Sequence, residues 1–205
     1  LKTWRLPQGS RNARGRPIVN VLPVRPGVSI AAIMPVDKPE DQWERLTIVF
    51  GTGAGDVRRN KLSDFTNVKA NGKIAMKLPE GVALVSARIC DEADGVHFDA
   101  TSEERAAYLK MRRAVEGGGE DEEDAGSDEE PVADIALSQE RYAEMSAADE
   151  TILTITSKGL GKRSSSHEYP VRGRGGQGVS AANLTARKND PDRRDARIVA
   201  AWPVG

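Results

Sequence analysis

Hydrophobic and polar residues alternate over short stretches along most of the chain, which is the pattern of half-buried β-strands. One such pattern occurs twice, in Leu46–Phe65 and in Glu150–Tyr169. Each copy contains an apolar strand, a glycine turn, a strand with two basic residues and then an aromatic residue. The basic pairs are Arg58-Arg59 and Lys162-Arg163. The pattern predicts a β-hairpin in each copy.

A second pattern follows each hairpin and also occurs near the start of the chain. In it, a Gly-containing basic segment leads through a loop to an apolar strand. The three copies are Arg14–Leu22 with Ile30–Val36, Asn71–Leu78 with Leu84–Cys90, and Arg174–Val179 with Ile198–Val204. The complete unit then has four short strands and is present in about two and a half copies, which is typical of propeller-like folds. We predict an all-β fold of four-stranded blades, incomplete in this chain.

The segment 100–150 interrupts the strand pattern. Thr101 and Glu104 form a capping box, which predicts a helix over Ser102–Val115, and a second short helix is predicted over Ser138–Ala148. Between them, Glu120–Glu130 carries eight carboxylates in eleven residues, and we expect this run to be disordered. We therefore divide the chain into blades at 1–99, an insert at 100–150 that projects from a loop, and a further blade at 151–205.

Charge is distributed unevenly along the chain. The net charge is −1, but residues 100–150 carry −11 and the remainder carries +10. A basic body favours a polyanionic partner, although ordinary surface charge would give the same composition. The acidic run is then either a solvated spacer or a competitor that visits the basic surface and tunes binding of the polyanion.

The cellular setting follows from a few absences in the sequence. The chain has one cysteine, Cys90, within an apolar strand pattern, so we expect a core thiol and a reducing cytoplasm. No apolar run reaches about 18 residues, so no membrane span is expected. The chain begins with Leu1 in the middle of a pattern, which suggests a fragment of a longer protein.

Catalytic chemistry is not predicted. His97 and His167 lack neighbours at metal-ligand spacing, and Gly51–Gly55 lacks the Gly-Lys-Ser/Thr of a P-loop. The pair Arg141-Tyr142 lies in a helix of the insert, and we do not interpret its tyrosine as a catalytic nucleophile. The matched aromatic residues Phe65 and Tyr169 are predicted to lie in the core.

Three blocks together resemble the carboxy-terminal β-pinwheel of bacterial DNA gyrase A subunits, and the insert resembles one found in gyrases of alphaproteobacterial type. The blocks are Arg5–Leu22 with its Ala13-Arg14-Gly15-Arg16-Pro17, Thr52–Leu78 with its Asn71-Gly72-Lys73, and Gly159–Gly178 with its Arg172-Gly173-Arg174-Gly175-Gly176-Gln177-Gly178. The resemblance covers most of the chain.

The resemblance implies a pinwheel of about six blades that wraps duplex DNA and supports ATP-dependent negative supercoiling. It implies partnership with a second gyrase A chain and with the gyrase B subunit, in the bacterial cytoplasm at the nucleoid. It also implies ATP and Mg²⁺ bound elsewhere, with no cofactor and no catalytic residue in this segment. Two features depart from the family. A full blade is missing between Cys90 and the insert, and the family's Gly/Arg-rich box would lie before Leu1.

Candidate DNA contacts are the basic and Gly-flanking residues that recur in the blocks, because phosphate contacts hold a duplex without reading its sequence. They are Arg11, Arg14, Arg16, Arg58, Arg59, Lys61, Lys73, Lys162, Arg163, Arg172, Arg174 and Gln177, with Lys69 as an auxiliary. Three alternatives stay open: the equivalent domain of topoisomerase IV, a propeller-like protein-interaction module without DNA binding, and a non-functional gene remnant.

Overall fold

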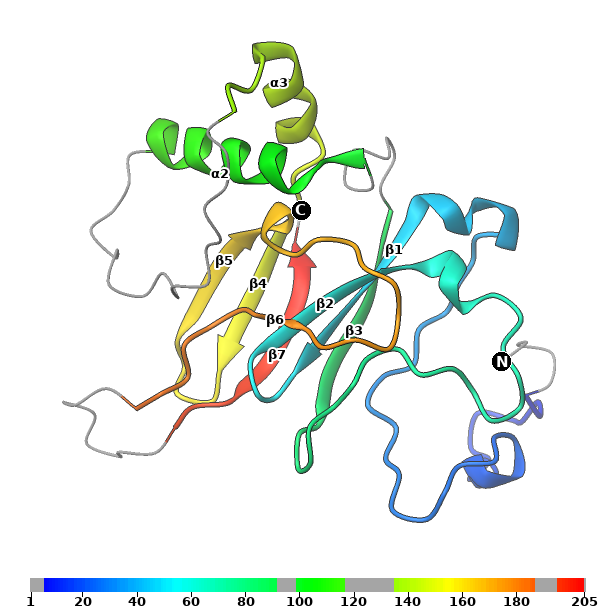
Figure 1. Ribbon diagram of the computed structural model, residues 1–205. Coiled ribbons are helices and arrows are strands. Elements are labelled where there is room, and N and C mark those ends of the chain that lie inside the picture. The colour runs from blue at the N-terminus through cyan, green and yellow to red at the C-terminus, as the bar shows by residue number, and fades with distance from the viewer. Residues whose placement is uncertain (1–5, 92–98, 117–134, 187–194, 205) are drawn as a thin grey trace.

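Two antiparallel sheets form the body of the protein, with two helices packed at one end (Figure 1). The structure is a computed structural model and describes residues 6–91, 99–116, 135–186 and 195–204. One sheet has the strand order β3-β1-β2-β6 and the other has the order β5-β4-β7. The strands are β1 (Leu46–Thr52), β2 (Asp56–Lys61), β3 (Leu84–Asp91), β4 (Thr151–Thr156), β5 (Gly161–Ser165), β6 (Val179–Ser180) and β7 (Ile198–Val204).

The two predicted hairpins are confirmed as β1–β2 and β4–β5, and their turns share the same hydrogen bond. Thr52 Oγ1 accepts a hydrogen bond from the amide of Asp56 at 3.0 Å, and Thr156 Oγ1 accepts one from Leu160 at 3.1 Å. Both turns contain a glycine with positive φ, 95° at Gly55 and 77° at Gly159, a conformation that strains any residue with a Cβ. A short 3₁₀ helix follows each hairpin, η4 (Leu62–Phe65) and η6 (Ser166–Glu168).

The fourth strand of the first sheet does not come from its own unit, which corrects the prediction of four consecutive strands per blade. Strand β6, from the third block, pairs with the outer edge of β2 through Asp56↔Ser180 and Val57↔Val179. Residues 71–78 form no strand and lie instead beside the loop that precedes β6, where Lys77 N donates to Gly176 O at 2.9 Å. Hydrogen bonding between segments far apart in sequence therefore completes this sheet.

The first block also differs from its prediction. Neither Arg14–Leu22 nor Ile30–Val36 forms a strand, and only the 3₁₀ helices η2 (Ile18–Asn20) and η3 (Glu40–Arg45) occur before β1 in the described residues. A strand needs a neighbour for its backbone N–H and C=O groups, and no described strand pairs with this segment. Several of its apolar side chains are consequently exposed, with Ile33 at 82%.

The main core lies between the two sheets. Alternate residues of the first sheet, including Val49, Val57 and Cys90, pack against Ile152 and Ile198 of the second. A second core covers the opposite face of the first sheet, and its residues include Phe50, Leu62, Met76 and the half-buried Phe65. Tyr169 is 2% exposed, so both matched aromatic residues belong to the packed interior, as predicted.

The helices of the insert are α2 (Ser102–Glu116) and α3 (Gln139–Ala147), close to the predicted ranges. The capping box is confirmed, because Thr101 N donates to Glu104 Oε2 at 2.8 Å and Glu104 N donates to Thr101 Oγ1 at 3.1 Å. The predicted acidic run Glu120–Glu130 lies outside the described residues. No helix in the described ranges combines the length and apolar character that crossing a bilayer requires.

The helical pair packs onto the body at η6. Met145 and Tyr108 form a small core, and the Tyr108 ring meets His167 of η6 edge-on at 4.7 Å between ring centroids. His167 Nε2 donates to the carbonyl of Met145 at 2.9 Å. Figure 1 shows α2 lying across the upper ends of β4 and β5.

Candidate nucleic-acid interface

The Gly-rich loop 172–178 runs along the outer edge of β2 and connects η6 to β6. Its first residue is fixed at both backbone groups, because Arg172 N donates to Arg59 O at 3.0 Å and Asn60 Nδ2 donates to Arg172 O at 2.6 Å. Gly175 turns the chain with φ of 84°, and its amide donates to Ala75 O at 2.7 Å. The loop therefore presents Arg172 and Arg174 from a fixed backbone, and both side chains are exposed.

Arg58 holds this loop in place from beneath. Its guanidinium donates hydrogen bonds to the carbonyl oxygens of Gly173 and Gln177 and is 6% exposed. The loop passes so closely that a Cβ on Gly176 would stand 2.9 Å from Arg58 Nη1. Burial lowers the pKa of Arg58, and the charge of Arg172 lowers it further.

Arg59 lies in the interior at 1% exposure and joins the first sheet to η6. Its Nη1 donates to Ser166 O at 3.1 Å, and its Nη2 lies 3.4 Å from Thr47 Oγ1. Burial lowers the pKa of Arg59, and the nearby carboxylates of Glu150 and Asp149 act in the opposite direction. This guanidinium is part of the packed structure.

The prediction that Arg58 and Arg59 line an exposed basic rim is therefore wrong. Residues 172–178 cover β2, and the two side chains satisfy backbone carbonyls of that loop and of η6. Their sequence equivalents Lys162 and Arg163 on β5 are both exposed. The same position in the repeat is buried in one unit and open in the other, depending on what lies over it.

The remaining candidates fall into two groups. Lys61 and Lys73 are half-buried, with Lys61 3.6 Å from Glu44 Oε2 and Lys73 donating to Asp64 O at 3.1 Å. The others are exposed: Arg11, Arg14, Arg16, Lys162, Arg163, Arg172, Arg174 and Gln177. Figure 1 places the N-terminal segment far from β5, so the structure does not bring Arg11, Arg14 and Arg16 together with Lys162 and Arg163.

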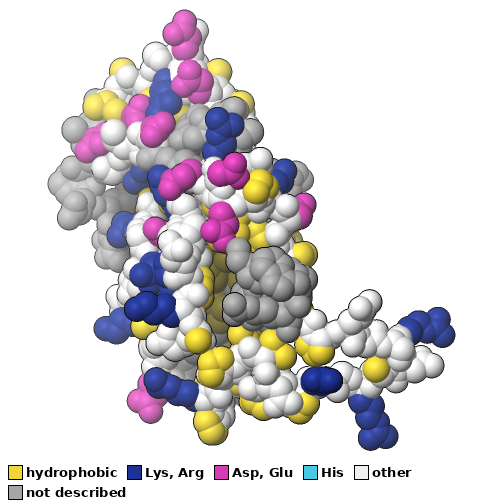
Figure 2. Space-filling model, turned by 90° about the vertical axis from the view of Figure 1, so that its right-hand side faces the viewer, with side chains coloured by type: hydrophobic (Ala, Val, Ile, Leu, Met, Phe, Trp, Pro, Cys, Tyr) yellow, Lys and Arg dark blue, Asp and Glu magenta, His cyan; other side chains and the backbone are white. Residues whose placement is uncertain are grey.

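Charge is segregated over the surface in the same way as along the sequence. On the face shown in Figure 2, Asp and Glu gather mainly over the upper part, which holds the helices, whereas Lys and Arg predominate lower down. This separation favours a polyanion on the body of the protein.

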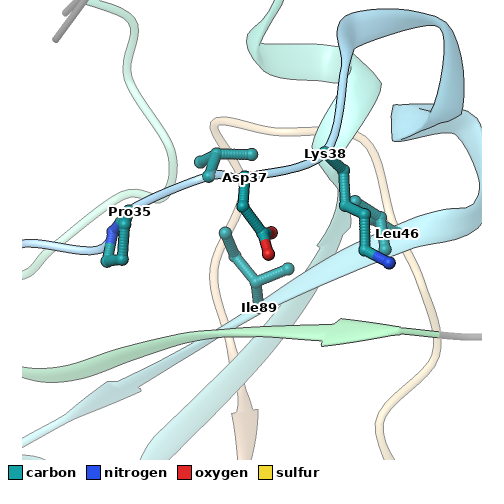
Figure 3. A pocket seen from close by; sticks show the side chains of 6 residues that line it. Pro35, Asp37, Lys38, Leu46 and Ile89 are labelled. Atoms are coloured by element: carbon teal, nitrogen blue, oxygen red, sulfur yellow. The ribbon is translucent and has the colours of Figure 1, made fainter.

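A pocket of about 220 Å³ lies between the segment before η3 and the first sheet (Figure 3). Apolar side chains, including Leu46 and Ile89, form most of its wall, and Asp37 and Lys38 supply one charge of each sign. Figure 3 shows the Asp37 carboxylate directed toward Ile89. This lining does not bring together the several polar groups that a substrate site uses.

Metal and thiol chemistry receive no support from the described residues. No three His, Cys, Asp or Glu side chains in these ranges are grouped as a metal ion would require, and His97 lies outside them. Burial raises the pKa of Cys90 to about 12, so its thiol stays protonated. Cys90 is a core residue, as predicted.

Sequence reasoning missed two residues at the junction of the insert and the body. Asp149 accepts hydrogen bonds from Tyr108, Arg112, Ser165 and Ser166. The predicted hairpin offered a signal for this, because pairing β4 with β5 brings the residues just before β4 close to the end of β5. Arg105 in the first turn of α2 gave no such signal, because the segment around it is acidic overall.

Comparison with known proteins gives one consistent family. A sequence model described as "DNA gyrase C-terminal domain, beta-propeller" matches residues 1–37, 47–91 and 150–190 and passes over the insert. The DNA gyrase A subunit of Granulibacter bethesdensis is 38% identical over 259 positions, covering 99% of the chain and 27% of that protein. The corresponding protein of Rickettsia bellii is 32% identical, covering 100% and 26%.

Two further observations follow from these comparisons. The Granulibacter alignment spans more positions than the 205 residues of the chain, so that relative carries internal residues that this chain lacks. A solved structure titled "Structure of DNA gyrase A C-terminal domain" aligns with a TM-score of 0.53 and 14% identity, covering 94% of the chain and 41% of that structure. The likeness is one of fold.

Proposed function

The chain belongs to the DNA gyrase A C-terminal domain family, and on this basis we propose that it binds duplex DNA through phosphate contacts without reading the base sequence. The domain has the β-propeller-like fold of that family. In this proposal it acts as an accessory to a type IIA topoisomerase, bending DNA so that strand passage introduces negative supercoils. The chain spans about a quarter of the length of the curated relatives named above, so the activity of the whole enzyme is part of the proposal.

The observation that carries the proposal is the Gly-rich loop with its exposed arginines. Arg172 and Arg174 form no ion pair with another described residue, and Arg58 fixes the loop backbone beneath them. A guanidinium offers two parallel donors to a phosphate, and a backbone held in advance loses little entropy when the phosphate arrives. A fixed loop that carries such arginines is suited to holding a DNA backbone.

The proposed contact residues are the exposed candidates, and the buried pair takes another role. Arg58 positions the loop, and Arg59 positions η6, so neither is assigned a phosphate. The proposed contacts are Arg11, Arg14, Arg16, Lys162, Arg163, Arg172, Arg174 and Gln177, with Lys61 and Lys73 as secondary contacts.

The holoenzyme context belongs to the same proposal. The partners would be a second gyrase A chain and the gyrase B subunit, in the bacterial cytoplasm at the nucleoid. ATP and Mg²⁺ would bind to other parts of that assembly, and this segment would need no cofactor of its own.

The test is binding to a labelled duplex of about 40 bp across a salt series. One variant replaces four exposed candidates with glutamine, at Lys162, Arg163, Arg172 and Arg174. A control variant removes the same charge from four other exposed arginines, at Arg25, Arg45, Arg88 and Arg197. We expect the slope of log K against log salt to fall by about 0.9 for each phosphate contact removed in the first variant, and to stay close to wild type in the control.

The outcome separates the proposal from its rivals. Equal slopes in the two variants would show that net charge alone attracts DNA and would contradict the assignment of these residues. Absence of salt-dependent binding by the wild-type chain would favour a protein-interaction module. A shift of only the control variant would place the DNA path on another face.

A further inference from the structure

Three arginines lie on elements that come together where the insert joins the body, and the charge of Arg172 acts on the other two. Arg58 comes from β2, Arg172 from the Gly-rich loop and Arg105 from the first turn of α2. Two contacts bring these elements together. The backbone of Arg172 is bonded to Arg59 and Asn60 of β2, and the side chain of Arg59 reaches Ser166 in η6, on which α2 packs.

These arginines have no counter-charge at contact distance among the described residues. None of the three forms an ion pair with a described residue. The carboxylate of Glu104, which precedes Arg105, pairs with Arg141 at 2.9 Å and accepts a hydrogen bond from the amide of Thr101. Burial lowers the pKa of Arg105, and repulsion from Arg172 lowers it further, whereas the carboxylates of Glu103 and Glu104 act in the opposite direction. Arg172 acts on the pKa of Arg58 in the same direction. Like charges gathered without a partner are costly unless an anion joins them.

The Arg105 side chain is held against its own helix, and that helix is anchored to the body. Its Nη1 donates to Ala100 O at 2.6 Å. Helix α2 is anchored by Tyr108 Oη, which donates to Asp149 Oδ2 at 3.0 Å, and by an ion pair between Arg112 and Asp149. Asp149 in turn accepts from Ser165 Oγ at 2.8 Å. Helix α2, which carries Arg105, is therefore fixed to the second sheet.

We propose that Arg105 and Arg172 together form a phosphate-binding site at the junction of α2 and the Gly-rich loop, by which the insert extends the DNA path of the body. The ligand is a backbone phosphodiester of duplex DNA, and the inference rests on the function proposed above. Arg172 and Arg105 are the contacting groups, and the buried Arg58 positions the loop. In this proposal the insert contributes one cation, Arg105, to the DNA path, and the body contributes the rest. It does so although the insert as a whole carries a net negative charge.

The experiment measures the salt slope of duplex binding for the full chain and three single variants. Arg105→Gln and Arg172→Gln each remove one member of the site. Arg113→Gln is the matched control, because it removes the same charge from an exposed position on the same helix. We expect each of the first two changes to lower the slope by about 0.9, and the control to leave it unchanged. Arg105→Lys should restore most of the slope, because it keeps the charge.

The variants distinguish failure of this inference from failure of the proposed function. If Arg172→Gln lowers the slope and Arg105→Gln does not, the insert has no part in the DNA path and the inference is overturned. If Arg113→Gln lowers the slope as much as Arg105→Gln, the net charge of the helix and not a specific site attracts the DNA, and the inference is overturned. If the wild-type chain shows no salt-dependent binding, the proposed function fails. Thermal unfolding of each variant shows whether the fold is kept.

Discussion

Gly178 lies so close to Asp56 that a Cβ on the glycine would stand 2.7 Å from the Cβ of the aspartate. The same Cβ would also stand 3.0 Å from the carbonyl oxygen of Val57. This approach lets the loop enter the outer edge of β2, where β6 begins one residue later. The fourth strand of the first sheet depends on the absence of a side chain at this position.

Gly178→Ala is therefore expected to destabilise the protein by about 1–3 kcal/mol, because backbone and a strand residue must move to admit the methyl group. Gly173→Ala is the matched control, since no atom lies within 4 Å of its added Cβ. We expect the control to be neutral or to stabilise slightly by restricting the unfolded chain. Urea unfolding measures both, and equal midpoints would contradict the close packing of β6 on β2.

Arg58→Gln should loosen the Gly-rich loop without unfolding the sheets, because two carbonyls lose a charged donor. Such bonds contribute about 2 kcal/mol together, which corresponds to roughly 30-fold faster opening. Hydrogen exchange reports this opening at two amides, that of Gly175, which donates to Ala75 O, and that of Lys77, which donates to Gly176 O. The exposed Arg88 supplies the control Arg88→Gln. Unchanged exchange at both amides would show that Arg58 does not hold the loop.

Asp149→Asn should release the helical insert from the body. The carboxylate accepts from four residues, and an amide in its place turns a donor toward some of those donors. We expect a loss of about 3 kcal/mol in the docking of α2, seen as faster hydrogen exchange in α2 than in β1. Glu140→Gln on the exposed face of α3 is the control. Parallel changes in α2 and β1 would mean that the insert does not undock as a separate unit.

His167 should make the protein less stable in mild acid. Burial lowers its pKa from the ordinary value of 6.5, with Met145 O and Asp149 acting in the opposite direction and Arg59 and Arg105 in the same direction. The unfolded chain then binds more protons than the folded one, so stability falls as the pH drops below about 6.5 and levels off below the lowered pKa.

The check for His167 is urea unfolding at several pH values between about 7.5 and 5, for wild type and for His167→Gln, whose side-chain amide can still donate to Met145 O. Carboxylates titrate in both proteins, so the difference between the two curves isolates the imidazole. We expect wild type to lose more stability than the variant over this range. Superimposable curves would show that His167 does not stay neutral in the fold.

Local features of the fold were predictable because they arise within a few residues. The turns after Thr52 and Thr156 depend on a side-chain oxygen, an amide four residues later and a nearby glycine, all visible in the sequence. The capping box at Thr101 is of the same kind. The packing of Cys90 and Tyr169 followed from the alternation of apolar residues along a strand.

Strand partners could not be predicted in the same way. β6 is two residues long and pairs with β2, more than a hundred residues earlier in the chain. Nothing in the composition of Val179-Ser180 selects that edge over another. The segment 18–36 has the same limit from the other side. Its hydrophobic pattern suits strands, but no described strand pairs with it, and it forms none.

The sequence alone determined the repeat, its two hairpins, the helical insert and the family, because each of these depends on residue order along the chain. Only the tertiary structure decided which basic residues are exposed at the surface. Arg58 and Lys162 hold the same place in the repeat, yet Arg58 is 6% exposed and Lys162 lies on an open strand. The loop 172–178 covers β2 and binds Arg58 through its carbonyls, and no described segment does the same over Lys162. A residue is buried by the segments that the fold packs against it, and those segments can be far away in the sequence.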